Sequence, residues 1–107
     1  MNPDKFTKAV VKLLEESKAE NLQLIDVRDY TPFSEYYILV TATNTRQMNA
    51  IKDSVVDKLE SMKGRVSHVE GSENSGWILI DAYHLIINIF SKEERERISL
   101  ERILAKR

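Results

Sequence analysis

Histidine suits both metal binding and acid–base catalysis, and this chain has two of them, His68 and His84. Neither has a second histidine at a spacing typical of metal ligands, whereas a zinc site needs several convergent ligands. No Gly-x-Ser-x-Gly motif is present to expose a nucleophilic serine. We interpret both histidines as solvent-facing polar residues, one in a strand and one in a turn. The sequence predicts no catalytic residue, no metal ion and no cofactor.

Three carboxylates offer a different interpretation. Asp26 and Asp29 lie at a predicted strand end and Asp81 follows another strand, and carboxylates at such places can bind Mg²⁺ for nucleotidyl transfer. Metal ligands on one strand are usually two residues apart, because that spacing puts them on the same face. Asp26 and Asp29 are three apart, and none of the chain's three glycines lies near them to build a phosphate-binding loop. A metal-dependent nucleotidyltransferase is therefore the alternative, and a non-enzymatic protein the main prediction.

The segment 70–77, EGSENSGW, is the most informative candidate for binding. Two glycines bracket a polar loop, and the only tryptophan, Trp77, follows this loop at the start of a predicted strand. Tryptophan is enriched among the residues that dominate protein interfaces. Ala82 and Tyr83 are expected at the tip of the following hairpin, where we do not expect a core role. The alternative is that Trp77 packs under the last helix and stabilises the sheet edge.

The segment 44–47, NTRQ, is a second candidate, at a predicted helix start. Backbone amides there can bind an anion, and Arg46 is suited to pairing with a carboxylate or phosphate. The alternative is an ordinary capped helix. The last predicted helix is interpreted as a solvated face, because acids are interspersed among its basic residues, and contact of the basic residues with RNA is the alternative. These basic residues are Arg95, Arg97, Arg102, Lys106 and Arg107.

The hydrophobic pattern predicts the elements that position these residues. Helices are expected over 3–19, 45–62 and 92–106, with Asn2, Asn44 or Thr45, and Ser91 as N-caps. Gly64 is expected in a left-handed conformation after the second helix. Strands are expected over 22–27, 35–43, 66–69, 77–80 and 85–90, with a turn over 70–76. The order α-β-β-α-β-β-β-α predicts an α+β fold, one mixed sheet of about five strands covered by helices.

Length and composition set further limits. With 107 residues, 42% of them hydrophobic, the chain is expected to form a single domain over 1–107. The net charge of −1 argues against general affinity for a nucleic-acid backbone, and the absence of cysteine excludes disulfides and thiolate sites. The N-terminus lacks a signal-peptide pattern, and no apolar run reaches the roughly 20 residues that span a bilayer. We therefore expect a cytoplasmic protein.

Several segments together resemble the ribosome silencing factor family, whose members are related to Iojap. One is the strand 34–41, SEYYILVT, followed by 44–47, NTRQ. A second is Glu70-Gly71 followed by 77–81, WILID, and a third is the closing apolar strand and Arg-rich helix with Leu100-Glu101. The resemblance extends from about Phe6 to Leu104.

The resemblance implies a nucleotidyltransferase-like fold without transferase activity. It implies binding to a large-subunit ribosomal protein on the joining face, exclusion of the small subunit, repressed translation, and a homodimer when free. An assembly factor for the large subunit would share the same docking site. By position, Trp77 is the central contact, with Ala82 and Tyr83 beside it, and the surface is framed by Glu70, Asn74 and Asp81.

The chain also departs from the family pattern. Ala42 stands where the family usually has a glycine, and 81–84, DAYH, replaces Asp-Tyr-Gly-Asp at the hairpin. Because glycine adopts a positive φ at little cost, its loss suggests a different turn there. Asn88 stands in place of a common histidine, and Ile98 and Leu104 stand where the last helix usually has aromatic residues.

Overall fold

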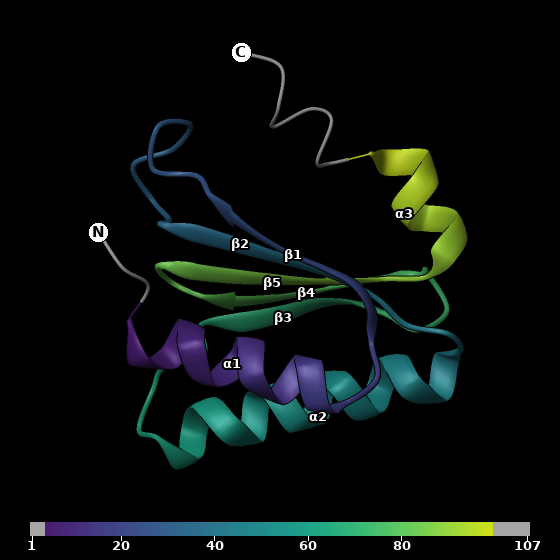
Figure 1. Cartoon of the computed structure of the whole chain (residues 1–107), viewed down its shortest axis with the longest axis horizontal. Helices are drawn as coiled ribbons and strands as arrows, with labels where there is room; N and C mark the ends of the chain where they lie inside the picture. Colours follow the sequence, from purple (N-terminus) through teal and green to yellow (C-terminus); the bar gives the residue numbers. More distant parts are fainter. Residues whose placement is uncertain (1–3, 100–107) are drawn as a thin grey trace.

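A computed structural model describes residues 4–99, which form a single sheet with helices on both of its faces (Figure 1). The order of the elements is the predicted one and confirms the mixed α+β fold. Their bounds are α1 Lys5–Glu16, β1 Glu20–Asp26, β2 Tyr36–Thr41, α2 Thr45–Ser61, β3 His68–Ser72, β4 Trp77–Ala82, β5 Leu85–Phe90 and α3 Lys92–Ile98. No helix in the described range is long and apolar enough to cross a membrane.

The strands lie in the order β1-β2-β5-β4-β3. Only β2 and β5 run parallel among neighbours in the sheet, and the other neighbouring pairs are antiparallel. All of β5 is buried at the centre, as expected for a strand that reads as an almost continuous apolar run. The outer strands β1 and β3 are mostly exposed.

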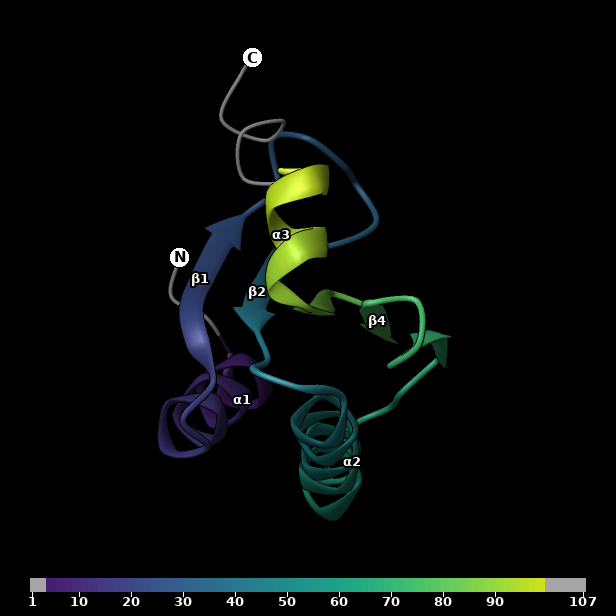
Figure 2. The ribbon, with the colours of Figure 1, turned by 90° about the vertical axis from the view of Figure 1, so that its right-hand side faces the viewer.

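The two faces of the sheet have different coverings. Helices α1 and α2 pack on one face, and α3 lies over one end of the other (Figure 2). Because side chains alternate along a strand, Ile78 and Ile80 of β4 join the core beneath α1 and α2, whereas Trp77 points to the other side. We call this second side the open face. Its residues include Glu70 of β3, Trp77, Leu79 and Asp81 of β4, and Asn88 of β5.

The start of α1 differs from the prediction. Asp4 is the N-cap, with an extended backbone and a side chain that accepts a hydrogen bond from Thr7 N at 2.9 Å. The prediction of a cap at Asn2 is therefore wrong, and residues 2 and 3 themselves lie outside the described range. The helix starts later because the Asp4 side chain satisfies one of the free amides of its first turn, that of Thr7.

The end of α2 also differs from the prediction. Of the two predicted caps, Asn44 and Thr45, it is Asn44 that caps its start, accepting from Gln47 N at 2.8 Å. At the other end, Lys63 adopts the left-handed conformation, with a φ of 62°, rather than Gly64. Gly64 instead allows a close approach, because a Cβ there would lie 3.0 Å from the ring of Phe6.

Strand β3 begins and ends two or three residues later than predicted. Residues 70–72 belong to the strand rather than to the turn, and Gly71 pairs with Ile78. The φ of Gly71 is 82°, a value that glycine adopts readily even within a ladder. The strand therefore contains a glycine, and glycine is also typical of turns, which is why the sequence of this segment predicts a turn.

Helix α3 is capped by Ser91, whose Oγ accepts a hydrogen bond from Glu94 N at 3.2 Å, as predicted. The helix ends at Ile98, and Ser99 takes a left-handed conformation with a φ of 51°. The rest of the helix predicted up to residue 106 lies outside the described residues.

Candidate functional site

Trp77 lies at the start of β4, between Ser72 of β3 and Phe90 of β5. Its indole Nε1–H donates a hydrogen bond to Asn88 Oδ1 at 3.1 Å, and its ring lies 5.2 Å from the ring of Phe90 between centroids. The side chain is only half-buried. Trp77 therefore packs within the sheet and also presents surface to solvent, and its role as a partner contact stays a prediction.

Two glycines shape the loop that carries Trp77. Gly76 has a φ of 79°, and a Cβ on it would lie 2.6 Å from Glu94 Cγ of α3. A Cβ on Gly71 would lie 2.0 Å from the carbonyl oxygen of Trp77. Ser75 closes the loop, with its Oγ 2.8 Å from the carbonyl oxygen of Ser72. The loop can pack against β4 and α3 this closely only with glycine at positions 71 and 76.

Trp77 borders a hollow between the β3–β4 hairpin and α3. The lining residues of this hollow are Glu70, Gly71, Ser75, Trp77, Leu79, Glu94 and Arg97. On the α3 side, Arg97 donates to Glu94 at 2.9 and 2.7 Å, and these hydrogen bonds lower the pKa of Glu94. The lining thus combines the apolar side chains of Trp77 and Leu79 with charged groups of both signs, which suits contact with a protein better than contact with a polyanion.

A polar row continues along the open face from Glu70 to Asp81. His68 Nε2 lies 3.0 Å from Glu70 Oε1, and His68 Nδ1 lies 3.9 Å from Asp81 Oδ2. Asp81 Oδ1 also accepts a hydrogen bond from Tyr83 N at 2.9 Å. His68 is an exposed strand residue, as predicted, whereas His84 in the turn pairs with Asp4.

The predicted placement of Ala82 and Tyr83 beside Trp77 is wrong. Trp77 and Ala82 are the first and last residues of β4, which at roughly 3.3 Å per residue separates them by about 16 Å. Ala82 is 4% exposed and belongs to the core, because it continues the inward series of Ile78 and Ile80. Tyr83 is exposed in the two-residue loop, where it takes a φ of 67° without a glycine.

Asn74 and Arg46 also lie at the Trp77 end of the sheet, but in different settings. Asn74 is exposed in the β3–β4 turn that precedes Trp77. Arg46 is exposed in the first turn of α2, which packs on the face opposite to Trp77. The structure therefore brings Glu70 and Trp77 to the same hollow, places Asn74 in the turn before Trp77, and leaves Arg46 on the other side of the sheet.

Arg95 is not available for RNA. It is 8% exposed, and its Nη1 donates to Thr41 Oγ1 at 2.9 Å, which anchors α3 to β2. Arg97 is exposed but paired with Glu94. The other basic residues proposed for RNA contact, at positions 102, 106 and 107, lie outside the described residues.

The three carboxylates of the alternative interpretation do not converge. Asp26 is on β1 and Asp81 on β4, with β2 and β5 between them. Asp26 instead accepts hydrogen bonds from Arg28 Nε at 2.9 and 3.1 Å, and these lower its pKa from 3.8 to about 2. Within residues 4–99, no group of three or more potential ligands is placed to hold a metal ion.

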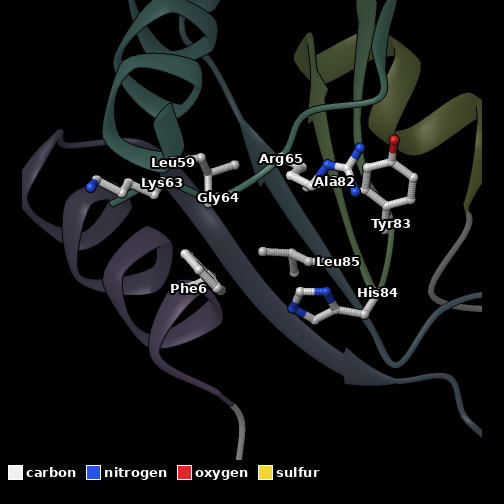
Figure 3. A pocket seen from close by; sticks show the side chains of 9 residues that line it. All are labelled: Phe6, Leu59, Lys63, Gly64, Arg65, Ala82, Tyr83, His84 and Leu85. Carbon is white, nitrogen blue, oxygen red and sulfur yellow. The ribbon is translucent and has the colours of Figure 1, made fainter. Parts of the chain in front are cut away.

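A second hollow, which no sequence signal predicts, lies at the other end of the sheet (Figure 3). It forms where the start of α1, the end of α2 and the β4–β5 hairpin meet. Its lining residues are Phe6, Leu59, Lys63, Gly64, Arg65, Ala82, Tyr83, His84 and Leu85. The periodicity of Phe6, Leu59 and Leu85 predicted that they face the core, but not that these three segments leave a space between them.

Comparison with known proteins identifies relatives over nearly the whole chain. A family model described as "Ribosomal silencing factor during starvation" matches residues 1–107. A ribosomal silencing factor of Zymomonas mobilis is 28% identical over 102 residues, which are 95% of this chain and 77% of that protein. A protein of Mus musculus named mitochondrial assembly of ribosomal large subunit protein 1 is 25% identical over 97 residues, 88% of this chain and 42% of that protein.

The fold is also found in a solved structure. A crystal structure of a protein from Chromobacterium violaceum aligns with a TM-score of 0.91 and 23% identity, covering 100% of this chain and 89% of that one. The mixed sheet and its helices are thus an architecture that has been observed experimentally.

Proposed function

The chain belongs to the family of ribosomal silencing factors, which is related to Iojap, and on this basis we propose that it binds the large ribosomal subunit and represses translation. Its partner is a ribosomal protein at the subunit interface. The bound protein occupies space that the small subunit needs, so the two subunits cannot associate.

The observation that carries this proposal is the position of Trp77 on the open face. Its ring is held by Asn88 and Phe90 and so loses little conformational freedom when a partner covers it. A rigid aromatic side chain beside a hollow is the usual form of an interface anchor. Glu70 and Leu79 line the hollow beside it, Asn74 lies in the turn before it, and Asp81 lies further along the same face.

The proposed action is steric and involves no chemistry by this chain. Chemistry would need a converging set of reactive side chains, whereas Asp26 is paired with Arg28 and Asp81 lies three strands away from it. The near-neutral net charge of −1 favours a protein partner over extended contact with ribosomal RNA, which at most is minor.

Assembly of the large subunit is a second candidate function, favoured by the name of the mouse relative. An assembly factor would use the same docking surface but act on immature particles. Deletion would then cause precursors of the large subunit to accumulate, whereas a silencing factor would leave mature subunits at normal abundance and raise translation in starved cells.

We further propose that the protein works in the cytoplasm and that free chains form a homodimer. Sedimentation velocity at increasing concentration tests the dimer, which appears as a reversible shift to about twice the monomer mass. A species that stays monomeric up to high concentration contradicts it.

Subunit joining provides the direct functional test. Purified small and large subunits are mixed while light scattering is recorded, with and without saturating protein. We expect a large drop in the amplitude of joining, and none when the protein carries Glu70→Lys on the open face. Asp57→Lys, an equal charge change on the exposed side of α2, is the matched control and should inhibit like the unaltered protein. Joining at a normal rate with the site saturated would overturn the proposal.

A further inference from the structure

The hollow at the hairpin end of the sheet has the size of a small-molecule site. It encloses about 310 Å³, at the lower end of the roughly 300–1,000 Å³ typical of ligand pockets. Its middle is apolar, with Leu85 projecting toward Phe6 and Leu59 above them (Figure 3). An apolar group that enters it removes hydrocarbon surface from water on several sides at once.

The close approach of Gly64 to Phe6 shapes one wall of this pocket. A Cβ at position 64 would lie 3.0 Å from Phe6 Cε1 and 3.1 Å from the carbonyl oxygen of Leu59. The Phe6 ring is also held from two other directions, since Lys5 Nζ lies 5.2 Å from its centroid and the His84 ring 6.3 Å. The wall is therefore formed before any ligand arrives.

The charge of the lining is of one sign. Lys63, Arg65 and His84 are its ionisable basic residues, and none of the lining residues in the described range is acidic. Asp4 pairs with His84 and offsets that side chain, which leaves Lys63 and Arg65 as the net positive charge. The Arg65 guanidinium lies 5.6 Å from the centroid of the exposed Tyr83 ring, an arrangement that orients it at the hairpin side of the pocket.

The end of α2 carries partial negative charge, which disfavours an anion. Hydrogen bonds to its last carbonyl groups offset part of this charge. Gly64 N donates to the carbonyl oxygen of Leu59 at 2.7 Å, and Lys63 N to that of Glu60 at 3.0 Å. The two side-chain cations are thus the groups left to recognise a charged ligand.

We propose that this pocket binds a small amphipathic anion, an aromatic or branched apolar body that carries one carboxylate or phosphate head. The body lies between Phe6, Leu59 and Leu85, and the head meets Arg65 with Lys63 nearby. The proposal does not depend on ribosome binding, because the pocket and Trp77 lie at opposite ends of the sheet.

Backbone amide spectra of the isotope-labelled chain test this. The probes are phenylacetate and phenyl phosphate, which distinguish the two heads, with benzyl alcohol as the neutral counterpart and inorganic phosphate as the head alone. We expect saturable shifts at the amides of Gly64, Arg65, Tyr83 and His84 with at least one aromatic anion. Benzyl alcohol should bind about tenfold more weakly, and inorganic phosphate should not shift these amides.

Matched variants separate the charge from the fold. Arg65→Gln should weaken binding of the aromatic anion about tenfold, and Lys63→Gln should weaken it as well. Lys58→Gln, an exposed α2 residue outside the pocket, should not. Fluorescence of the distant Trp77 reports that each variant is folded. The proposal is overturned by an absence of saturable shifts at these amides, by benzyl alcohol binding as tightly as the anions, or by an unchanged affinity in Arg65→Gln.

Discussion

The indole Nε1–H of Trp77 donates a hydrogen bond to Asn88 Oδ1 at 3.1 Å, across neighbouring strands of the open face. Asn88 is 1% exposed, so its amide depends on partners within the protein. The other hydrogen bond of this side chain is weak, because its donor, Asn88 Nδ2, lies 3.5 Å from the carbonyl oxygen of Ile38. This hydrogen bond therefore orients the ring of Trp77, the proposed docking residue, and provides the buried amide of Asn88 with a partner.

A double-mutant cycle measures this bond. Trp77→Phe keeps an aromatic ring against Phe90 but removes the donor, and should lower the free energy of unfolding by about 1–2 kcal/mol. Asn88→Ala should cost a similar amount, and the double variant should show about 1 kcal/mol of coupling in urea denaturation followed by circular dichroism. Strictly additive single effects would show that the hydrogen bond contributes nothing.

The bond from Arg95 to Thr41 is expected to hold α3 on the sheet. Thr41→Val removes the acceptor at 2.9 Å and leaves a buried guanidinium with one partner fewer. We predict a loss of about 1–3 kcal/mol in the free energy of unfolding. Thr45→Val, at the exposed start of α2, is the matched control and should stay within about 0.5 kcal/mol of the unaltered protein. Equal effects of the two substitutions would contradict this role of Arg95.

Gly71→Ala tests the conformation of the loop that carries Trp77. The new Cβ would lie 2.0 Å from a backbone oxygen, at a φ of 82°, so the hairpin must shift. We expect a loss of at least about 2 kcal/mol in thermal or urea unfolding, from backbone strain and steric clash together. Gly64→Ala should cost less, because its main contact is the Phe6 side chain and its φ is not in the left-handed region. The reverse ranking would mean that residues 71 and 77 are not packed as described.

Acid should weaken the fold in part through Asp26. Hydrogen bonds from Arg28 hold its pKa at about 2 in the folded chain, against 3.8 for the free group. A depressed folded pKa stabilises the fold above the unfolded pKa, and this contribution is lost as the pH falls through the folded value. Urea midpoints of the unaltered protein and Arg28→Gln should therefore converge between about pH 4 and pH 2. A gap that stays constant over this range would contradict the pairing.

Parts of this structure follow directly from local sequence signals. The five apolar residues of β5, three of them isoleucine, are enough to define its bounds, and Asn44 and Ser91 act as helix caps, as the sequence predicts. These features depend on neighbours along the chain, which is why they are visible before the fold is known.

The features that were predicted wrongly, or not at all, depend on contacts between distant segments. A glycine with positive φ is typical of a turn, so Gly71 concealed the extent of β3. Ala82 is small and lies next to a turn, yet the packing of the helices buries it. The pocket around Leu85 needs α1, α2 and the hairpin together, and no single segment contains its pattern.

Co-sedimentation with purified large ribosomal subunits tests the central claim most directly. The unaltered protein, Trp77→Ala and the control Asp57→Lys are each titrated against a fixed amount of subunit, after circular dichroism confirms that each is folded. We predict that the unaltered protein and the control pellet with the subunit. Trp77→Ala should bind about 30-fold more weakly or not at all, the loss of at least about 2 kcal/mol typical of an interface anchor. An unaltered protein that stays in the supernatant at every concentration, or a folded Trp77→Ala variant that pellets equally well, would contradict the account.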